Sequence, residues 1–358
     1  MDAPEGTVAD PGITQAELRL AARNHGLPLE ALRYDVTPPG LHYLLSHYDI
    51  PAVDAAAFRL EIGGSVERPL ELGLDELRRR ERVELPVTFE CAGNGRALMQ
   101  PRPLSAPWLT EAVGTAVWAG TPLLELLDEA DMRPEAIEVL LSGLDSGLEG
   151  GVPQAYERAL STADLEGALL AYEMNGAPLP PQHGFPLRLV VPGWYGMTNV
   201  KWLHRITVLD APFEGYQNAV SYRLYGAEGE PGDPVTRMLP RSLMVPPGVP
   251  DFFTRDRHVE PGAVTLFGRA WSGYGPVERL EVSTDGGESF APATLERPLG
   301  EAAWCGWRFE WEAQPGEHVL CSRATDTAGN AQPLEPPWNL KGYANNAVER
   351  IPVVAAAA

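Results

Sequence analysis

The sequence has few cysteines and no long apolar segment. Its 358 residues include three cysteines, at positions 91, 305 and 321, which do not form a disulfide framework and so favour a reducing compartment. No stretch approaches the roughly 20 apolar residues that a membrane-spanning helix needs. The first residues have neither the positive region nor the apolar core of a secretory signal. We therefore expect a soluble, cytoplasmic protein with no membrane partner.

Basic residues are also scarce. The chain has 28 lysines and arginines against 49 aspartates and glutamates, a formal net charge of −21 at pH 7. Phosphate contacts require a basic face, so this charge argues against nucleic acid as a partner. Only two of the basic residues are lysines, Lys201 and Lys341, which suggests positions where a compact point charge matters. A local group of cations inside such an acidic protein would be informative.

Cys91 lies where a thiol can do chemistry. The run Val83 to Phe89 has the β-branched and apolar content of a strand, and it leads to the thiol and then to Ala-Gly-Asn-Gly, a loop whose glycines permit positive φ and the close approach of another molecule. Arg96 follows closely enough to favour a thiolate. Cys91 can then ligate a soft metal or attack a carbonyl, and a buried core cysteine before a turn is the alternative. Cys305 and Cys321 lie in strand-like sequence and are predicted to be apolar core residues.

The stretch Cys91-Ala-Gly-Asn-Gly-Arg96 resembles the molybdenum-ligand motif of the sulfite oxidase family. Four later segments are similar to that family in the same order: Ala171–Gly176, His183–Arg188, Asn199–Leu203 and Trp338–Gly342. The resemblance implies one molybdenum per chain, held by the Cys91 thiolate and by the dithiolene sulfurs of a pterin. A single protein ligand would make a cluster of His and Cys ligands unnecessary.

The resemblance also assigns roles to individual residues. It implies contacts with the molybdopterin from Tyr43, Ser46, His47, Cys91, Asp145, His183, Arg188, Asn199, Val200 and Lys201. It implies catalytic roles for Cys91, Arg96, Tyr222 and Lys341, of which Cys91 is the metal ligand.

Three of the cofactor residues form a predicted phosphate cradle. Arg188, His183 and Lys201 would converge with Arg96, the lysine as a point charge and the arginine as a two-pronged donor. From the residues alone, His47 is a structural or solvated loop histidine and Asp145 is a turn aspartate, so these two depend on the resemblance.

The sequence departs from the family pattern at two substrate positions. Leu45 stands where the family has an arginine, and Lys341 stands for an arginine in Trp338-Asn-Leu-Lys-Gly. The first change removes a charge, and the second keeps the charge without the planar fork. We therefore expect sulfite to bind more weakly than in relatives with all their arginines, or a larger, less anionic sulfur or nitrogen oxide to be accepted.

Local patterns predict an α+β fold for the first part of the chain. Thr14 to Glu17 is a capping-box pattern that begins a helix, Leu74 to Arg82 is predicted to be a charged helix, and another helix is expected from about Thr121. The apolar run Ile137 to Leu141 is predicted to be a strand that ends in a loop carrying Asp145. Loops at strand ends are common ligand sites in α/β domains.

The pattern changes after about residue 235. Short alternating strands and the turn signal Asp285-Gly-Gly indicate an immunoglobulin-like β-sandwich, and the resemblance implies the same fold. We therefore expect a sulfite-oxidase-type molybdopterin-binding domain over residues 1–234 and a sandwich over 235–358. The sandwich is predicted to pair two chains in a two-fold homodimer.

The leading functional interpretation is a molybdenum-pterin oxidoreductase that transfers oxygen atoms in two-electron steps, with oxidation of sulfite to sulfate as the expected reaction. The sequence has no Cys-x-x-Cys-His, so we expect no haem and a separate electron acceptor. One alternative is the same cofactor acting on another sulfur or nitrogen oxide. Two others are a cysteine-nucleophile hydrolase with His47 or His183 as base, and a non-catalytic scaffold built on the sandwich.

Overall fold

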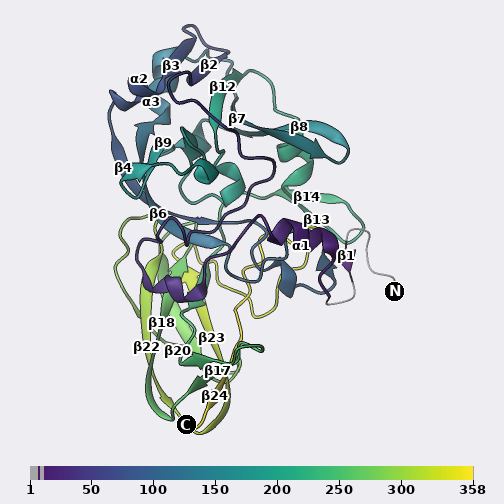
Figure 1. Cartoon of the computed structure of the whole chain (residues 1–358), viewed down its shortest axis with the longest axis vertical. Coiled ribbons are helices and arrows are strands. Elements are labelled where there is room, and N and C mark those ends of the chain that lie inside the picture. The colour runs from purple at the N-terminus through teal and green to yellow at the C-terminus, as the bar shows by residue number, and fades with distance from the viewer. Residues whose placement is uncertain (1–6, 9–11, 358) are drawn as a thin grey trace.

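The computed structural model describes residues 7–8 and 12–357. The first six residues, on which the expectation of a cytoplasmic protein partly rests, lie outside this range. Among the described residues, no helix is both long enough and apolar enough to cross a membrane. The N-terminal part combines sheets with short helices and the C-terminal part consists of strands (Figure 1), which confirms the predicted fold class.

Two five-stranded sheets form the N-terminal part. The first has the order β10-β9-β6-β4, with β11 also paired to β9; these strands are Ala177–Pro178, Leu169–Met174, Val113–Pro122, Val83–Glu90 and Arg188–Val190. The second has the order β3-β2-β12-β7-β8; these strands are Leu70–Gly73, Arg59–Gly64, Leu203–Leu209, Glu138–Glu149 and Val152–Leu160. Apolar side chains of both sheets share one core with helices α2 (Leu74–Arg78) and α3 (Leu123–Ala130).

Helix α1 (Gln15–Ala21) begins as its capping box predicts, because the Thr14 hydroxyl accepts from the Glu17 amide and the Glu17 carboxylate accepts from the Thr14 amide. The remaining short elements of this part are β1 (Thr7–Val8), which pairs with β5 (Arg102–Pro103), the β13–β14 ribbon (Arg223–Tyr225 and Pro231–Pro234), the 3₁₀ turns Leu29–Arg33, Arg96–Leu98, Ala163–Leu165, Pro181–His183 and Gly196–Thr198, and the π-helix Gln217–Ser221.

Two local predictions differ from the structure. The helix expected over 74–82 ends at Arg78, because β4 begins at Val83 opposite Gly120 and needs the residues between for a turn. The strand expected to end at Leu141 continues to Glu149 and pairs with β8. Its register shifts between Ser142 and Ser146, so Asp145 lies in a β-bulge and not in a loop after the strand.

The C-terminal part is a β-sandwich. One sheet has the order β15-β18-β22-β21, which are Arg241–Met244, Gly262–Trp271, Cys305–Ala313 and Thr294–Leu295. The other has the order β16-β17-β24-β23-β19-β20, which are Val249–Pro250, Arg257–Val259, Ile351–Ala355, Gly316–Asp326, Val277–Ser283 and Ala291–Pro292. Cys305 and Cys321 are buried, unpaired strand residues, as predicted.

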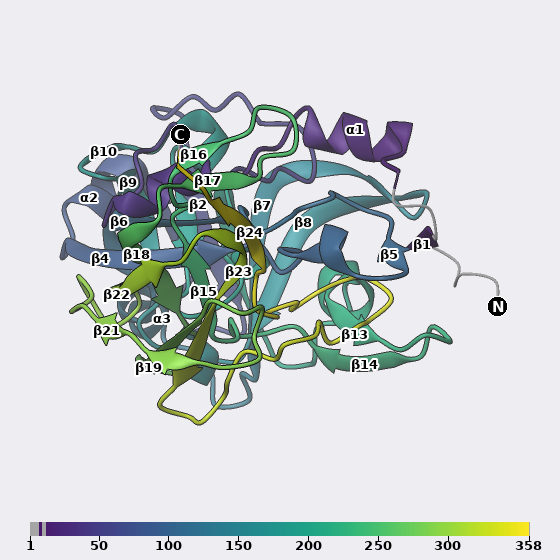
Figure 2. The same ribbon diagram turned by 90° about the horizontal axis from the view of Figure 1, so that it is seen from below.

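The two parts are joined by a shared core. Seen from below, the strands of the sandwich lie in front of the N-terminal sheets (Figure 2). Apolar side chains from both sides of residue 235 pack in one cluster, among them Leu32 and Ala92 from the first part and Trp271 and Trp304 from the second. The 234/235 boundary remains a prediction, and the contact across it is extensive.

Candidate functional site

Cys91 follows the last residue of β4 and begins a tight loop. Its amide donates to the Ala112 carbonyl at 2.9 Å, and its carbonyl accepts from the Asn94 amide at 2.9 Å. Gly95 has φ +85°, which favours glycine. A Cβ on Gly93 would lie 2.5 Å from the Arg96 guanidinium, so a side chain there would displace Arg96. The thiol is 8% exposed. Burial raises its pKa, and the charge of Arg96 opposes that rise.

Glu90, the residue before Cys91, is a fully buried carboxylate that ties the loop to the sandwich. One oxygen accepts from Arg241 at 2.9 Å and from Asn94 at 2.9 Å, and the other accepts from Trp271 at 2.9 Å. Both side chains of the Glu90–Arg241 pair are 2% exposed. Residues of β15 and β18 thereby hold the residue next to the thiol.

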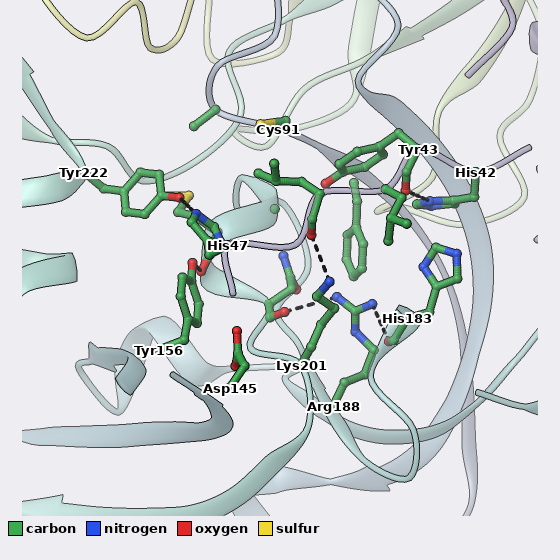
Figure 3. A pocket seen from close by; sticks show the side chains of 17 residues that line it. His42, Tyr43, His47, Cys91, Asp145, Tyr156, His183, Arg188, Lys201 and Tyr222 are labelled. Atoms are coloured by element: carbon green, nitrogen blue, oxygen red, sulfur yellow. Dashed lines mark hydrogen bonds between the residues drawn. The ribbon is translucent and has the colours of Figure 1, made fainter. Parts of the chain in front are cut away.

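The thiol lies on the wall of a pocket (Figure 3). Nine of the predicted residues line it: Tyr43, His47, Cys91, Asp145, His183, Arg188, Asn199, Lys201 and Tyr222. The cavity measures about 60 Å³. Pockets for cofactor-sized ligands measure roughly 300–1,000 Å³, so a pterin would extend through the mouth.

Two cations, the buried Arg188 and the half-buried Lys201, face this pocket without a carboxylate at ion-pair distance among the described residues. Arg188 donates to the carbonyls of His183 (3.0 Å) and Asn199 (3.1 Å). Lys201 donates to the Leu45 carbonyl at 2.8 Å and to the Ser46 hydroxyl at 3.0 Å. Burial lowers the pKa of Lys201 to about 7 and that of Arg188 to about 10. Since an uncompensated buried charge is costly, this pair suits an anion such as a phosphate.

Asp145 supplies an acceptor to the same pocket. Its Oδ1 is buried and has no hydrogen-bond partner in the structure. Burial raises the pKa of this carboxyl to about 6, and the positive charge of Lys201 opposes the rise. A buried acceptor without a donor is rare, and the N–H groups of a pterin ring could donate to it.

The histidines of the pocket are held neutral by burial, which lowers the pKa of His42 to about 4 and that of His47 to about 3 and also lowers that of His183. His47 Nε2 lies 2.6 Å from the Tyr222 hydroxyl. The structure shows no hydrogen bond between a described histidine and Cys91, so the arrangement expected of a cysteine-nucleophile hydrolase is not formed.

Four predicted site residues do not line the pocket. Ser46 is connected to the pocket through the hydrogen bond that its hydroxyl accepts from Lys201. Val200 lies in the apolar core, where its carbonyl accepts from the Leu189 amide. Arg96 donates to the carbonyls of Lys341 (2.8 Å) and Ala106 (3.1 Å), so it does not join the phosphate cations as expected. The reason is that its guanidinium folds back over Gly93. Lys341, half-buried, donates to the carbonyls of residues 220 and 221.

Other pocket residues were not assigned from the sequence. His42, Phe89, Tyr156 and Met197 also line the pocket. Tyr156 lies on β8, donates to the Met197 carbonyl at 2.6 Å and has its ring 4.6 Å from that of His47. In the sequence, the only indication that Tyr156 could face a site was its place in the alternating pattern of a strand.

The residues fit a metal held mainly by its cofactor. Among the described residues there is no group of three or more His, Cys, Asp or Glu side chains that could hold a metal ion. A soft metal would find one thiolate, at Cys91, and would need its other sulfurs from a bound group. The cations and the free Asp145 oxygen lie in the same pocket as that thiol.

Comparison with known families gives two matches. Residues 47–217 match the oxidoreductase molybdopterin binding domain, and residues 241–356 match the Mo-co oxidoreductase dimerisation domain.

Individual relatives agree with these matches. The chain is 37% identical to sulfite oxidase of Gallus gallus, over 88% of the chain and 72% of that protein. It is 35% identical to the mitochondrial sulfite oxidase of Homo sapiens, over 89% of the chain and 61% of that protein. It is 31% identical to nitrate reductase [NADH] 1 of Oryza sativa subsp. japonica, over 87% of the chain and 37% of that protein. The chain thus spans about three fifths of the human relative.

Among solved structures, sulfane dehydrogenase SoxCD from Paracoccus pantotrophus superposes with a TM-score of 0.80 at 26% identity, covering 93% of this chain and 86% of that one.

Proposed function

The chain belongs to the sulfite oxidase family of molybdopterin oxidoreductases, and from this membership we propose that it oxidises sulfite to sulfate. In that reaction sulfite gains one oxygen atom from water and loses two electrons, which pass to a separate acceptor. The observation that carries the proposal is the pocket beside Cys91, where Arg188 and Lys201 have no carboxylate partner among the described residues and Asp145 has a free oxygen. A non-catalytic scaffold would leave these groups without a role.

The chain's own residues would hold the cofactor from three sides. Cys91 would ligate the molybdenum, Arg188 and Lys201 with the neutral His183 would bind the phosphate, and Asp145 would accept from the pterin. When bound, the cofactor supplies two-electron oxygen-atom transfer. Charge-assisted bonds from an arginine fork and a lysine suit a phosphate dianion. Tyr43, Ser46, His47, Asn199 and Val200 remain predicted cofactor contacts.

The side of Cys91 next to Tyr222 would receive the substrate. Tyr222 is 5% exposed and shares a 2.6 Å hydrogen bond with His47. Because His47 is neutral at physiological pH, its Nε2–H tautomer can donate to the phenol oxygen, which leaves the Tyr222 hydroxyl proton to be donated to a substrate oxygen. Arg96 and Lys341 would place positive charge where the anion binds.

Sulfite kinetics test the reaction and the effect of the two departures. The proposal expects molybdenum in the purified protein and sulfite oxidation with an artificial electron acceptor. Leu45→Arg and Lys341→Arg should each lower the KM for sulfite, by about tenfold or more, because a charge-assisted hydrogen bond contributes roughly 1.5–3 kcal/mol.

Two outcomes would count against these assignments. A KM that falls in neither variant would contradict a role for both positions in binding sulfite. If sulfite is not oxidised while another sulfur or nitrogen oxide is turned over, the alternative substrate class holds; the nitrate reductase relatives and the apolar Leu45 wall are what favour it.

Lys201→Ala should weaken cofactor binding by about 10- to 100-fold, because it removes a cation from the phosphate side. Molybdenum per chain should fall, while turnover per bound molybdenum changes little. Lys341→Ala, which removes the only other lysine, is the matched control and should keep full molybdenum content. Full occupancy with reduced turnover per metal in Lys201→Ala would instead place Lys201 in the substrate site.

We propose that the sandwich pairs two chains, supported by the match of residues 241–356 to a dimerisation domain. The β16–β17 hairpin exposes Val249 in β16 and Phe252 and Phe253 at its tip, at 65%, 76% and 89%. Beside this hairpin runs a groove of about 1010 Å³ whose apolar wall includes Leu27, Leu98, Trp108 and Leu109, while residues 254–257 of the hairpin form a polar wall. A two-fold axis would let each chain insert its aromatic tip into the groove of its partner.

The double change Phe252→Ser, Phe253→Ser should raise the dimer dissociation constant by at least about 30-fold, since buried aromatic anchors contribute roughly 2 kcal/mol or more. Sedimentation velocity at micromolar concentration measures it. Leu148→Ser, at an exposed position (72%) of the first part, should leave the dimer unchanged. A monomeric wild type would refute the pairing, and an unaltered dimer in the double variant would refute this interface. The separate acceptor, the lack of haem and the cytoplasmic location stay predictions.

A further inference from the structure

Arg158 is a buried cation that no described acid neutralises. It lies on β8, is 4% exposed, and donates from Nη1 to the Gln217 carbonyl at 2.6 Å. Its Nε is buried and has no partner. Burial lowers the pKa of this guanidinium, and the groups that oppose the decrease are three tyrosines, Tyr156, Tyr222 and Tyr343. Carboxylates are absent from that set, although a buried arginine ordinarily has one.

The position of Arg158 connects it to the pocket. On β8 it is two residues from Tyr156, so the two side chains lie on the same face of the strand, and Tyr156 lines the pocket. The guanidinium carbon lies 5.5 Å from the centre of the Tyr222 ring, and Tyr222 also lines the pocket.

Two further cations lie near the segment that carries Tyr222, and they come from other elements. Arg96 lies 5.2 Å from the Tyr343 ring, which is itself 5.2 Å from that of Tyr222. Lys341 donates to the carbonyls at the end of the π-helix whose first carbonyl Arg158 binds. Arg96 and Arg158 therefore flank the Tyr222–Tyr343 pair. Lys341 lies further out, 4.3 Å from the centre of the Tyr225 ring and bound to the carbonyl of the residue before Tyr222.

One acid contributes to the field of this cation group. Glu149 raises the pKa of Lys341 against the effect of burial. Its carboxylate already accepts from Tyr48 at 3.0 Å and from Gln217 at 3.0 Å. With Asp145 of the same pocket counted as well, three positive charges against two negative charges leave a net positive field beside Tyr222, on the Cys91 side of an otherwise acidic protein.

We propose that Arg158 is the third cation of a small-oxyanion site beside Cys91 and supplies the positive charge that is absent at Leu45. This assignment rests on the proposed function and deepens it. Leu45 contributes an apolar wall to the pocket, and Arg158 approaches from β8 behind Tyr222. An oxyanion such as sulfite or sulfate there would offset the cost of the buried guanidinium.

The competing explanation is structural, with Arg158 serving only to bind the Gln217 carbonyl and pack against Tyr222. The two explanations differ in anion affinity. Calorimetric titration of the purified holoenzyme with sulfate, at constant ionic strength, measures that affinity without turnover. The variants are Arg158→Met, Arg158→Lys and, as a control, Arg205→Gln, which removes an exposed arginine paired with Glu61.

The proposal expects sulfate affinity to fall about 10- to 100-fold in Arg158→Met and by a smaller factor in Arg158→Lys, which keeps the charge and loses the fork. Arg205→Gln should match wild type. The KM for sulfite should rise in Arg158→Met with kcat less affected.

Unchanged sulfate affinity in a folded Arg158→Met variant with normal molybdenum content would overturn the proposal. If that variant does not fold, Arg158→Lys decides, since wild-type sulfate affinity there would also overturn it. If sulfate binding depends on Arg158 but the enzyme does not oxidise sulfite, the oxyanion site is supported and the proposed reaction is refuted. If the enzyme oxidises sulfite but its sulfate affinity does not depend on Arg158, the proposed reaction is supported and the role of Arg158 is refuted.

Discussion

Cys91→Ser should lose turnover by more than about 100-fold, which exceeds the effect usually seen when only a supporting partner of a metal ligand is removed. A serine hydroxyl is a harder and less readily ionised ligand than a thiolate, so the variant should also lose the sulfur-to-metal charge-transfer absorption that Cys91 contributes. The fold should persist, because serine fits the 8% exposed site and its backbone hydrogen bonds remain. Steady-state assays and absorption spectra of the holoenzyme measure both effects.

Cys305→Ser and Cys321→Ser are the matched controls. Both thiols are buried in sandwich strands away from the pocket, so each change should cost about 0.5–3 kcal/mol of stability and leave activity per molybdenum unchanged. Full activity and an unaltered spectrum in Cys91→Ser would refute the assignment of the metal ligand.

Arg241→Met should destabilise the protein by about 3–5 kcal/mol, because it leaves the Glu90 carboxylate buried without its cation. Removing Arg241 also takes away the donor to the Asn345 carbonyl at 2.7 Å. The expected secondary effect is a lower molybdenum content, since Glu90 precedes Cys91. Urea unfolding and metal analysis measure the two quantities.

Two further variants distinguish the effect of an unpaired buried charge on stability from the effect of removing side-chain volume. Arg205→Met breaks an exposed pair with Glu61, whose side chains are 52% and 51% exposed, and should cost no more than about 1 kcal/mol. Glu90→Gln combined with Arg241→Met removes both charges and should recover part of the loss. Arg241→Met with wild-type stability would show that Glu90 does not depend on this pair.

Local sequence predicted the parts of the site that local structure builds. The strand before Cys91 and its glycine loop followed from composition, and the resemblance located Arg188 and Lys201 in the same pocket. Asp145 was placed in a loop because the continuation of β7 and its bulge depend on pairing with β8, which has no signature within one strand.

Residues whose placement depends on distant segments were the ones missed. Arg158 and Tyr156 are alternate residues on β8, and nothing in that strand says which face meets the pocket. The orientation of Arg96 depends on the carbonyl of Lys341, which is 245 residues further along the chain. Such contacts follow from tertiary packing, and no periodic pattern in the sequence predicts them.

The anchoring of the Cys91 loop has a consequence for the timing of synthesis. The loop is fastened by Arg241, 151 residues downstream of Glu90, and by Asn345, 250 residues downstream of Gly95. Ribosomes add roughly 5–20 residues per second, so the second fastening follows the thiol by about 12–50 s. Throughout that interval the nascent N-terminal part carries a thiol whose loop is not yet fixed. We therefore expect stable capture of the cofactor only after the sandwich has been translated and has closed against Glu90.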